Sequence, residues 1–574
     1  MTAVPTLPQD DPTPTDRAAD LVAARARYTY SFDTYPGVAL VAQRPKDDTT
    51  PPQWSKVVDG ALTAVLANER AVDRPTLAGF EARMAETWHA ARDLVHEGLR
   101  TASNDLAAVL LGGTEHGDAT SLDDFRALFR TVPVPDAWAA VHDDVAFSRR
   151  WLAGSNPESL QRVRSLPDVP LSDAQIAAVS PGDQIAAAIE SGRLYEVDYR
   201  MLDGLPPNEL GPRPAVLAPA RGFLVRPWSS GVPRLFAIQL RPGGPVFTPA
   251  DGWGWRIART HLAAADTVVG AIWHHHARTH LVAEPLFVAA HRSLAPRHPL
   301  MVLLAQHAEG TLYINEVGAH TVFAPHGLLD WFTGTSQAGV RELARRSLED
   351  FDFLSSRLPE RLVNRGVSDP DLDFPYRDDA RLVWDALQTW VTGYVALYYR
   401  TDADVAADGE VAAWVLAASS ADGGGIRGLG GPPRTRANLV DLLTNLLFGA
   451  SALHAAMNFP VAEELTVIPA SPFGAWSPVP DRTDGWTEAD WLRTLPPLDA
   501  AQRQLDTALL LGMSRVGSLG DYPDGTFVDP RVAPVLAKFR ADLATAEQAI
   551  ADRNRKRKPY VHLMPSRIPP GINI

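Results

Sequence analysis

Four histidines fall within the eight residues WHHHARTH, which cover positions 273–280. Imidazole nitrogens bind transition metals, so this cluster predicts either a metal site or a hydrogen-bonded helix face. In a regular α-helix, His276 and His280 lie about 40° apart around the axis and share one face. His275 and His280 lie about 140° apart, unless a π-helical turn of the kind found at functional sites brings them together. From spacing alone, both pairs are candidates.

The composition restricts the chemistry open to this chain of 574 residues. It has no cysteine, which excludes disulfides, thiolate zinc sites, iron–sulfur clusters and a cysteine nucleophile. Any metal must therefore use nitrogen and oxygen ligands. The formal charge of −14 disfavours nucleic-acid binding. No uncharged apolar run reaches the ~18 residues of a transmembrane helix, and no signal peptide is recognised, so we expect a cytoplasmic protein.

Apolar residues recur mostly at helical spacing. The segments that predict long helices are 257–293, 378–399, 436–459 and 530–552, and further helices are predicted between 54 and 112. RLYEVDY and RLFAIQL, within the proline- and glycine-rich section 194–247, predict a small β-sheet. We therefore expect a mainly α fold, one large helical domain over residues 25–574 with a small β sub-structure. Residues 1–24, rich in proline and acidic side chains, are expected to be a disordered tail.

The residues around and after the histidine cluster resemble the iron-binding signature of the lipoxygenase family. The matching positions are two histidines separated by four residues, a Glu-Pro pair, an Arg-x-Leu triplet and a His-Pro step: His275, His280, Glu284, Pro285, Arg292, Leu294, His298 and Pro299. Other segments that resemble the family are 151–157 (WLAGSNP), 358–367 and 374–399. The likeness runs from about residue 125 to the carboxyl end.

This resemblance implies a metal centre with five protein ligands. Its second ligand pair is a histidine and an asparagine four residues apart, which LHAAMNF matches with His454 and Asn458. The fifth ligand is the terminal carboxylate of an isoleucine, and RIPPGINI ends the chain at Ile574. With His275 and His280, these groups would hold one non-haem iron (Fe2+/Fe3+), or manganese, and leave one position for water.

Membership of this family implies dioxygenation of polyunsaturated fatty acids that contain a cis,cis-1,4-pentadiene. In the family, a ferric hydroxide abstracts hydrogen from the bis-allylic carbon, and O2 adds to the radical to form a hydroperoxide. The expected partners are a fatty-acid or other lipid substrate and O2, with transient contact to a membrane surface. No coiled-coil pattern or partner surface is evident in the sequence, which predicts a monomer.

The resemblance also assigns positions in the substrate channel. Gly318 falls at the position that controls stereochemistry, where glycine is typical of members that form R hydroperoxides and alanine of members that form S products. The physical reason is that a missing β-carbon leaves room for O2 at a different end of the radical. Phe332 is large and predicts a shallow end to the pocket. The other channel positions implied are Leu281, Ile314, Val322 and Thr333.

The sequence departs from the family pattern in two respects. Residues before the WLAGSNP motif have helical spacing, so we expect no amino-terminal β-sandwich domain, as in bacterial members, and a helical lid over about residues 54–112 in its place. Two glutamines that accompany the metal ligands are absent, since Ala271 replaces one and FPVA stands in place of F-G-Q-Y after Asn458. Outer hydrogen bonds orient ligands and tune a metal.

Two other functions fit parts of the pattern. A non-catalytic lipid-binding protein of the same fold is suggested by the missing glutamines. A metallohydrolase would use His276 and His280, but the glutamate that such a helical pair needs between its histidines is absent.

Overall fold

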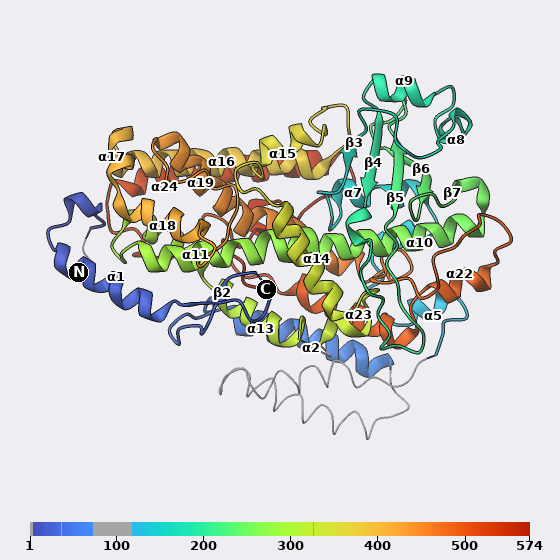
Figure 1. Ribbon diagram of the computed structural model, residues 1–574, viewed down its shortest axis with the longest axis horizontal. Helices are drawn as coiled ribbons and strands as arrows, with labels where there is room; N and C mark the ends of the chain where they lie inside the picture. Colours follow the sequence, from blue (N-terminus) through green and yellow to red (C-terminus); the bar gives the residue numbers. More distant parts are fainter. Residues whose placement is uncertain (1–3, 36, 73–116, 325–326) are drawn as a thin grey trace.

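Two long helical runs form the centre of the molecule. The first is continuous and consists of α10 (Trp253–Val268), the π-helix η6 (Val269–His280) and α11 (Leu281–Ser293). It crosses most of the length of the molecule in Figure 1. The computed structural model describes residues 4–35, 37–72, 117–324 and 327–574.

The second run consists of α19 (Arg436–Phe448), the π-helix η8 (Gly449–Leu453) and α20 (His454–Asn458). It meets the first run where η6 contacts both η8 and α20. Among the described helices, one stretch, Arg436–Glu464, is long and apolar enough to cross a membrane, but 89% of its 18-residue window is buried within the protein. This stretch therefore occupies the position of a core helix.

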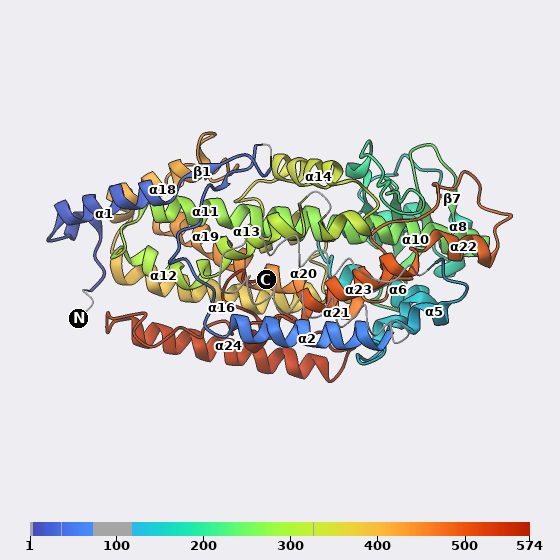
Figure 2. The same ribbon diagram turned by 90° about the horizontal axis from the view of Figure 1, so that it is seen from below.

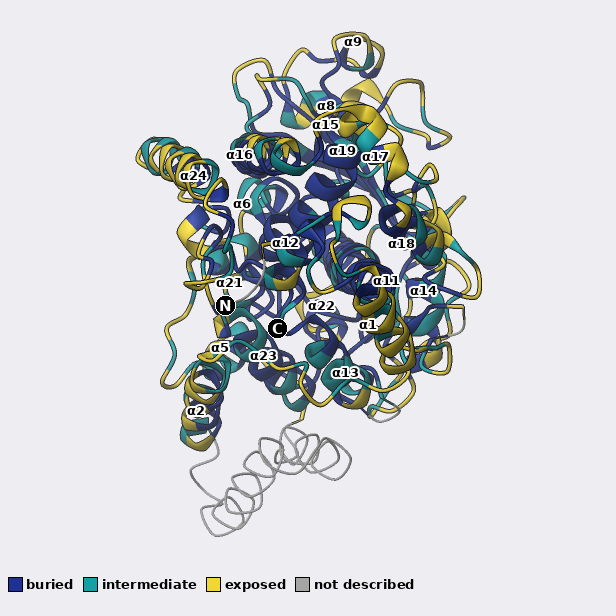
Figure 3. Cartoon of the chain, turned by 90° about the vertical axis from the view of Figure 1, so that its left-hand side faces the viewer, coloured by how far each residue is buried: buried dark blue, intermediate teal, exposed yellow. Residues whose placement is uncertain are grey.

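Further helices surround these two runs. α16 (Pro375–Tyr398) packs against α19 and against α24 (Val532–Asn554), while α18 (Gly409–Ser419) packs against α11 and α14 (Gln337–Asp350) against η6. Figure 2 shows α14 and α24 on opposite sides of the central run. Figure 3 shows buried residues in the middle and exposed residues on the outer faces of α1, α2 and α24. The described part of the chain confirms a mainly α fold.

A five-stranded antiparallel sheet lies at one end of the helical body (Figure 1). Its strands follow the chain order: β3 (Gln161–Arg162), β4 (Leu194–Asp198), β5 (Arg221–Val225), β6 (Arg234–Gln239) and β7 (Val246–Phe247). A second sheet pairs β1 (Tyr30–Ser31) with β2 (Leu40–Val41). RLYEVDY and RLFAIQL thus form β4 and β6, which confirms the predicted β sub-structure.

The expected disorder of residues 1–24 is wrong for the described part of that segment. Residues 14–27 form helix α1 (Pro14–Arg27), which packs against α11. Arg17 is buried, and its guanidinium donates to Asp11 Oδ2 over 2.7 Å and to Glu410 Oε2 over 2.9 Å. The composition was misleading because Pro14 opens the helix, where its missing N–H costs nothing, and Asp11 takes part in a buried ion pair.

Three helices beside the central runs carry residues that line an internal cavity. α2 (Trp54–Val72) packs against α23 (Leu498–Met513), and α13 (Thr311–Thr321) contacts α11. Of the expected lid, residues 73–116 lie outside the described residues. The other α-helices in the described part of the chain are α5 (Leu122–Arg126), α6 (Asp144–Ser148), α7 (Arg150–Ala153), α8 (Asp173–Val179), α9 (Ile185–Glu190), α12 (Pro299–Ala308), α15 (Leu358–Asn364), α17 (Asp402–Ala407), α21 (Val461–Glu464) and α22 (Glu488–Thr494).

Candidate metal centre

His275 and His280 lie side by side because the helix that carries them is π-helical. A π-helix bonds each residue to the fifth one along, so residues five apart share a face. η6 extends over both histidines, and their Nε2 atoms lie 3.3 Å apart. The backbone therefore brings together His275 and His280, one of the two pairs that spacing allowed.

The third histidine of the centre comes from the second helical run. The ring centroid of His454 lies 4.9 Å from that of His275 and 5.0 Å from that of His280, and those two are 4.9 Å apart. One ring nitrogen from each of the three lies within 4.8 Å of the others. A single ion between the rings would therefore have three imidazole ligands.

The protonation of these histidines fits metal binding. Burial lowers the pKa of His275 and His454 well below the ordinary value, and it lowers the pKa of His280 to about 4. All three rings are therefore neutral at physiological pH, which is the form that ligates metals. Both nitrogens of His454 are buried with no hydrogen-bond partner among the described residues. Since buried polar atoms normally have partners, the donor set fits a transition-metal ion.

His280 is oriented by a chain of buried hydrogen bonds. Its Nδ1 lies 2.7 Å from Oδ1 of Asn315, and Nδ2 of Asn315 donates to Glu284 Oε2 over 2.7 Å. The other oxygen of Glu284 accepts the N–H of Val41 over 2.7 Å. Because Nδ2 of Asn315 also donates to the backbone carbonyl of His280 over 3.3 Å, Oδ1 of Asn315 is the atom that accepts from the His280 ring. This places the His280 proton on Nδ1 and leaves Nε2 to face the other histidines.

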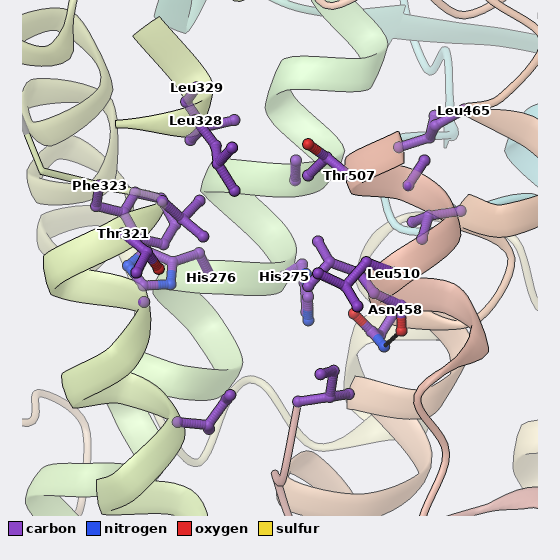
Figure 4. Close-up of a pocket in the computed structure, with 18 of the residues that line it drawn as sticks. His275, His276, Thr321, Phe323, Leu328, Leu329, Asn458, Leu465, Thr507 and Leu510 are labelled. Atoms are coloured by element: carbon purple, nitrogen blue, oxygen red, sulfur yellow. Dashed lines mark hydrogen bonds between the residues drawn. The ribbon is translucent and has the colours of Figure 1, made fainter. Parts of the chain in front are cut away.

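Asn458 and Ile574 line the same cavity as His275 and His280. Nδ2 of Asn458 donates to the carbonyl of Leu511 over 3.2 Å, which turns its Oδ1 away from that bond. Figure 4 shows His275 and Asn458 reaching into the same part of the cavity from two helices. Ile574 is 7% exposed, and its main chain raises the pKa of His454 against the larger effect of burial. The chain end thus lies beside the third histidine.

The carboxyl-terminal tail is held by side chains from distant elements. His307 Nδ1 donates to the carbonyl of Pro570 over 2.6 Å, and Trp54 Nε1 donates to the carbonyl of Asn573 over 2.6 Å. A β-carbon at Gly571 would lie 2.4 Å from the carbonyl oxygen of His307, so the tail can pass there only with glycine. Figures 1 and 2 both place the chain end in the middle of the molecule.

The other two histidines of the cluster have separate partners. Nε2 of His276 lies 2.9 Å from the hydroxyl of Tyr35, and the His276 ring stacks on Phe323 at 3.9 Å between centroids. Nε2 of His274 lies 3.5 Å from Oγ of Ser159. Neither histidine belongs to the described group that could hold an ion. The metallohydrolase pair His276 and His280 therefore gains no third ligand here.

A largely apolar cavity extends from the histidines between η6, α13, α23 and α2. Four of the predicted channel residues line it: Ile314, Gly318, Val322 and Phe332. Figure 4 shows Phe323, Leu328 and Leu329 on one side of this space and Leu465, Thr507 and Leu510 on the other. Such walls exclude water and suit a hydrocarbon chain.

The predicted channel residues Leu281 and Thr333 are buried but do not belong to the cavity lining. Leu281 directly follows His280, and successive helical residues point about 100° apart, so its side chain turns into the core. Thr333 follows the lining residue Phe332, and its carbonyl accepts from Nδ2 of Asn208 over 2.9 Å, which holds it toward a different loop. The structure thus places both residues next to the cavity lining in the chain but not within it, and their role in the channel stays a prediction.

Sequence reasoning missed much of the remaining lining. Glu284 was part of the family pattern, but only the structure reveals that Glu284 and Asn315 together orient His280. No local spacing connects α2 and α23 to a histidine cluster about 200 residues away. Their lining residues are Trp54, Val58, Asp59 and Leu62 from α2 and Gln504, Thr507, Ala508, Leu510 and Leu511 from α23.

Known proteins share both the sequence and the architecture. Residues 241–560 match the family model described as Lipoxygenase. The chain is 38% identical to the linoleate 9/13-lipoxygenase of Pseudomonas aeruginosa, across 84% of this chain and 73% of that protein, and 31% identical to human polyunsaturated fatty acid lipoxygenase ALOX15B, across 79% and 69%. The crystal structure of coral 8R-lipoxygenase matches the fold at a TM-score of 0.86, with 24% identity over 100% of this chain and 83% of that one. The chain therefore belongs to the lipoxygenase family.

Proposed function

We propose that this protein is a fatty-acid lipoxygenase that converts polyunsaturated acyl chains with a cis,cis-1,4-pentadiene into hydroperoxides. The observation that carries this proposal is the triangle of three buried, neutral histidines at the wall of an apolar cavity. In the reaction the bis-allylic methylene loses one electron and one proton as its C–H bond breaks, and O2 forms a C–O bond with the resulting carbon radical. The peroxyl radical then takes back one electron and one proton to give the hydroperoxide. The related enzymes described above are named for linoleate and for polyunsaturated fatty acids.

The residues proposed to hold the metal are His275, His280, His454, Asn458 and Ile574. A non-haem iron bound there would supply the one-electron oxidation of the methylene as it passes between Fe3+ and Fe2+. Three imidazoles, an amide oxygen and a carboxylate form a set that suits iron or manganese. The chain itself fixes the tautomer of His280 through Asn315 and keeps the site dry through its apolar walls.

We propose that Gly318 directs the product toward the R configuration. A β-carbon added at Gly318 would meet nothing nearer than two ring carbons of Phe323, each at 3.8 Å, which is ordinary contact. Glycine therefore leaves a methyl-sized space beside the cavity, and Gly318→Ala would fill it without strain. Chiral chromatography should give mainly R hydroperoxide from the native protein and a shift toward S for the variant. A dominant S product from the native protein would contradict this assignment.

The described part of the helical lid expected at residues 54–112 is helix α2. α2 contributes Trp54, Val58 and Leu62 to the cavity lining while its opposite face is exposed (Figure 3). We propose that α2 covers one side of the substrate cavity. Limited proteolysis should then cut the free protein near α2 faster than the protein saturated with linoleate, and equal rates would count against a cover.

The activity is tested by absorbance of the conjugated diene formed from linoleate. Protein loaded with Fe2+ should oxygenate linoleate, and metal-free protein should do so only after Fe2+ is restored. Loading with Mn2+ separates the two candidate metals. A loaded protein that binds linoleate and forms no diene would favour the alternative of a non-catalytic lipid-binding protein.

A further inference from the structure

Most polar side chains that line the cavity have their hydrogen bonds satisfied within the protein. Thr321 donates to the carbonyl of Val317 over 2.7 Å. Nε2 of Gln504 donates to the carbonyls of Leu465 over 2.7 Å and Ser471 over 2.8 Å. Such groups offer little to a ligand.

Two threonines of the lining, Thr267 on α10 and Thr507 on α23, differ from this pattern. They are 3% and 6% exposed, and the hydroxyl of each is buried with no hydrogen-bond partner among the described residues. A helical threonine often donates to the carbonyl four residues before it. Thr260 and Thr279 do so, over 3.0 Å and 2.6 Å, but Thr267 and Thr507 do not. Figure 4 shows Thr507 pointing from α23 into the cavity, toward the helix that carries His275.

Helical geometry places both hydroxyls beyond the metal ligands. Thr507 lies one turn before Leu511, whose carbonyl accepts from Asn458. Thr267 lies about two turns before His275 on the same lining face, with Ala271 between them. At about 5.4 Å per turn, the hydroxyls lie roughly one and two turns further along the two helices than the metal-site residues. A chain whose methylene lies at the metal would therefore pass them a few carbons later.

The energetics favour a ligand with an oxygen on its chain. An unpartnered buried hydroxyl costs about 1–3 kcal/mol, and a plain hydrocarbon segment cannot satisfy it. No lysine or arginine occurs among the described lining residues, so a neutral hydroxyl or hydroperoxyl group fits this place better than a carboxylate. Sites built to bond a substrate hydroxyl discriminate strongly against analogues that lack it.

We propose that Thr267 and Thr507 form a polar subsite that binds a hydroxyl or hydroperoxyl substituent on the acyl chain. The preferred substrates are then polyunsaturated chains that already carry one oxygen function and still contain an intact pentadiene. This inference rests on the proposed lipoxygenase function for its substrate class. The subsite therefore selects among such substrates by the position of the oxygen substituent along the acyl chain.

The test compares linoleate with a series of monohydroxy chains that keep the pentadiene and differ in hydroxyl position. One isomer should exceed linoleate in kcat/KM by about tenfold or more, which corresponds to about 1.4 kcal/mol. Thr267→Val and Thr507→Val, which are close to isosteric, should each reduce that preference by several-fold and raise the kcat/KM of linoleate. Thr321→Val is the matched control, because its hydroxyl is already bonded within the protein, and it should leave the preference unchanged.

The Kd values of the same compounds for metal-free protein separate this inference from the proposed function. If iron-loaded protein oxygenates neither class, the proposed function fails, and the Kd preference still tests the subsite. The proposal would be overturned if the native protein and both valine variants preferred the hydroxylated chain over linoleate to the same extent. The same result is expected if the two hydroxyls bind only water. Melting temperatures of the variants, measured alongside, exclude unfolding as the cause.

Discussion

The two sides of the metal centre are held in place by different means. His280 is fixed by hydrogen bonds that run through Asn315 to the buried Glu284, so the protein alone sets its orientation. His454 has no hydrogen bond among the described residues, and Ile574 is positioned through bonds to its neighbours, such as that from Trp54 to residue 573. The first side is preformed, whereas the second depends on packing and on the metal to satisfy its donors.

Changing the chain end should have the largest effect. One glycine added after Ile574 moves the carboxylate along the chain and places a peptide group beside His454. We expect complete loss of detectable oxygenation together with loss of bound iron, measured by elemental analysis. The same glycine added at the amino terminus is the control and should leave both unchanged. Retained iron and activity in the extended protein would show that the second side does not need its carboxylate.

The preformed side should reveal itself in the pH dependence of stability. Burial raises the pKa of Glu284 to about 7 from an ordinary 4.5. The folded protein then holds a proton that the unfolded chain releases between these values. Stability should therefore fall as pH rises through this window, by up to about 3 kcal/mol. Buried histidines such as His275 and His454, whose pKa is lowered, give an opposite slope that the native chain and Glu284→Gln share. Urea unfolding of metal-free protein at pH 4.5, 6 and 8 should therefore show the native chain losing stability relative to Glu284→Gln as pH rises, and parallel curves would contradict the prediction.

Removing the Asn315 amide, which connects His280 to Glu284, should weaken metal binding less than the change at the chain end does. Asn315→Ala frees the His280 ring to rotate, and losses of such outer partners typically cost 10- to 100-fold in metal affinity. Competition with a chelator measures the affinity. Glu316→Gln, on the same helix but paired with Arg44 away from the centre, is the matched control. An unchanged affinity for Asn315→Ala would mean that packing alone orients His280.

The smallest effect is expected from the bond between α2 and the tail. Trp54→Phe keeps an aromatic ring beside Tyr313, whose centroid lies 5.1 Å away, and removes the donor to the carbonyl of Asn573. Loss of about 1 kcal/mol corresponds to roughly fivefold faster iron release. Val58→Ala, another cavity-lining change on α2, should not alter that rate. Equal release rates for both variants would show that the tail needs no support from α2.

The sequence predicted the two sides of the centre to different depths. Helical spacing did not distinguish His275 from His276 as the partner of His280, because the pairing depends on a π-helix that the apolar periodicity does not predict. The resemblance supplied His454, Asn458 and Ile574, which local patterns would not connect. It could not supply the unpartnered hydroxyls of Thr267 and Thr507, since a missing hydrogen bond is a property of the folded neighbourhood. The long helices and the small sheet, set by local periodicity, were predicted well.

The most direct test of the central claim is an anomalous diffraction map at the iron absorption edge, from crystals of iron-loaded protein. We predict one peak within bonding distance of His275, His280, His454, the Asn458 oxygen and the Ile574 carboxylate. A peak bound by His276, or a map in which the chain end lies away from the iron, would contradict the account.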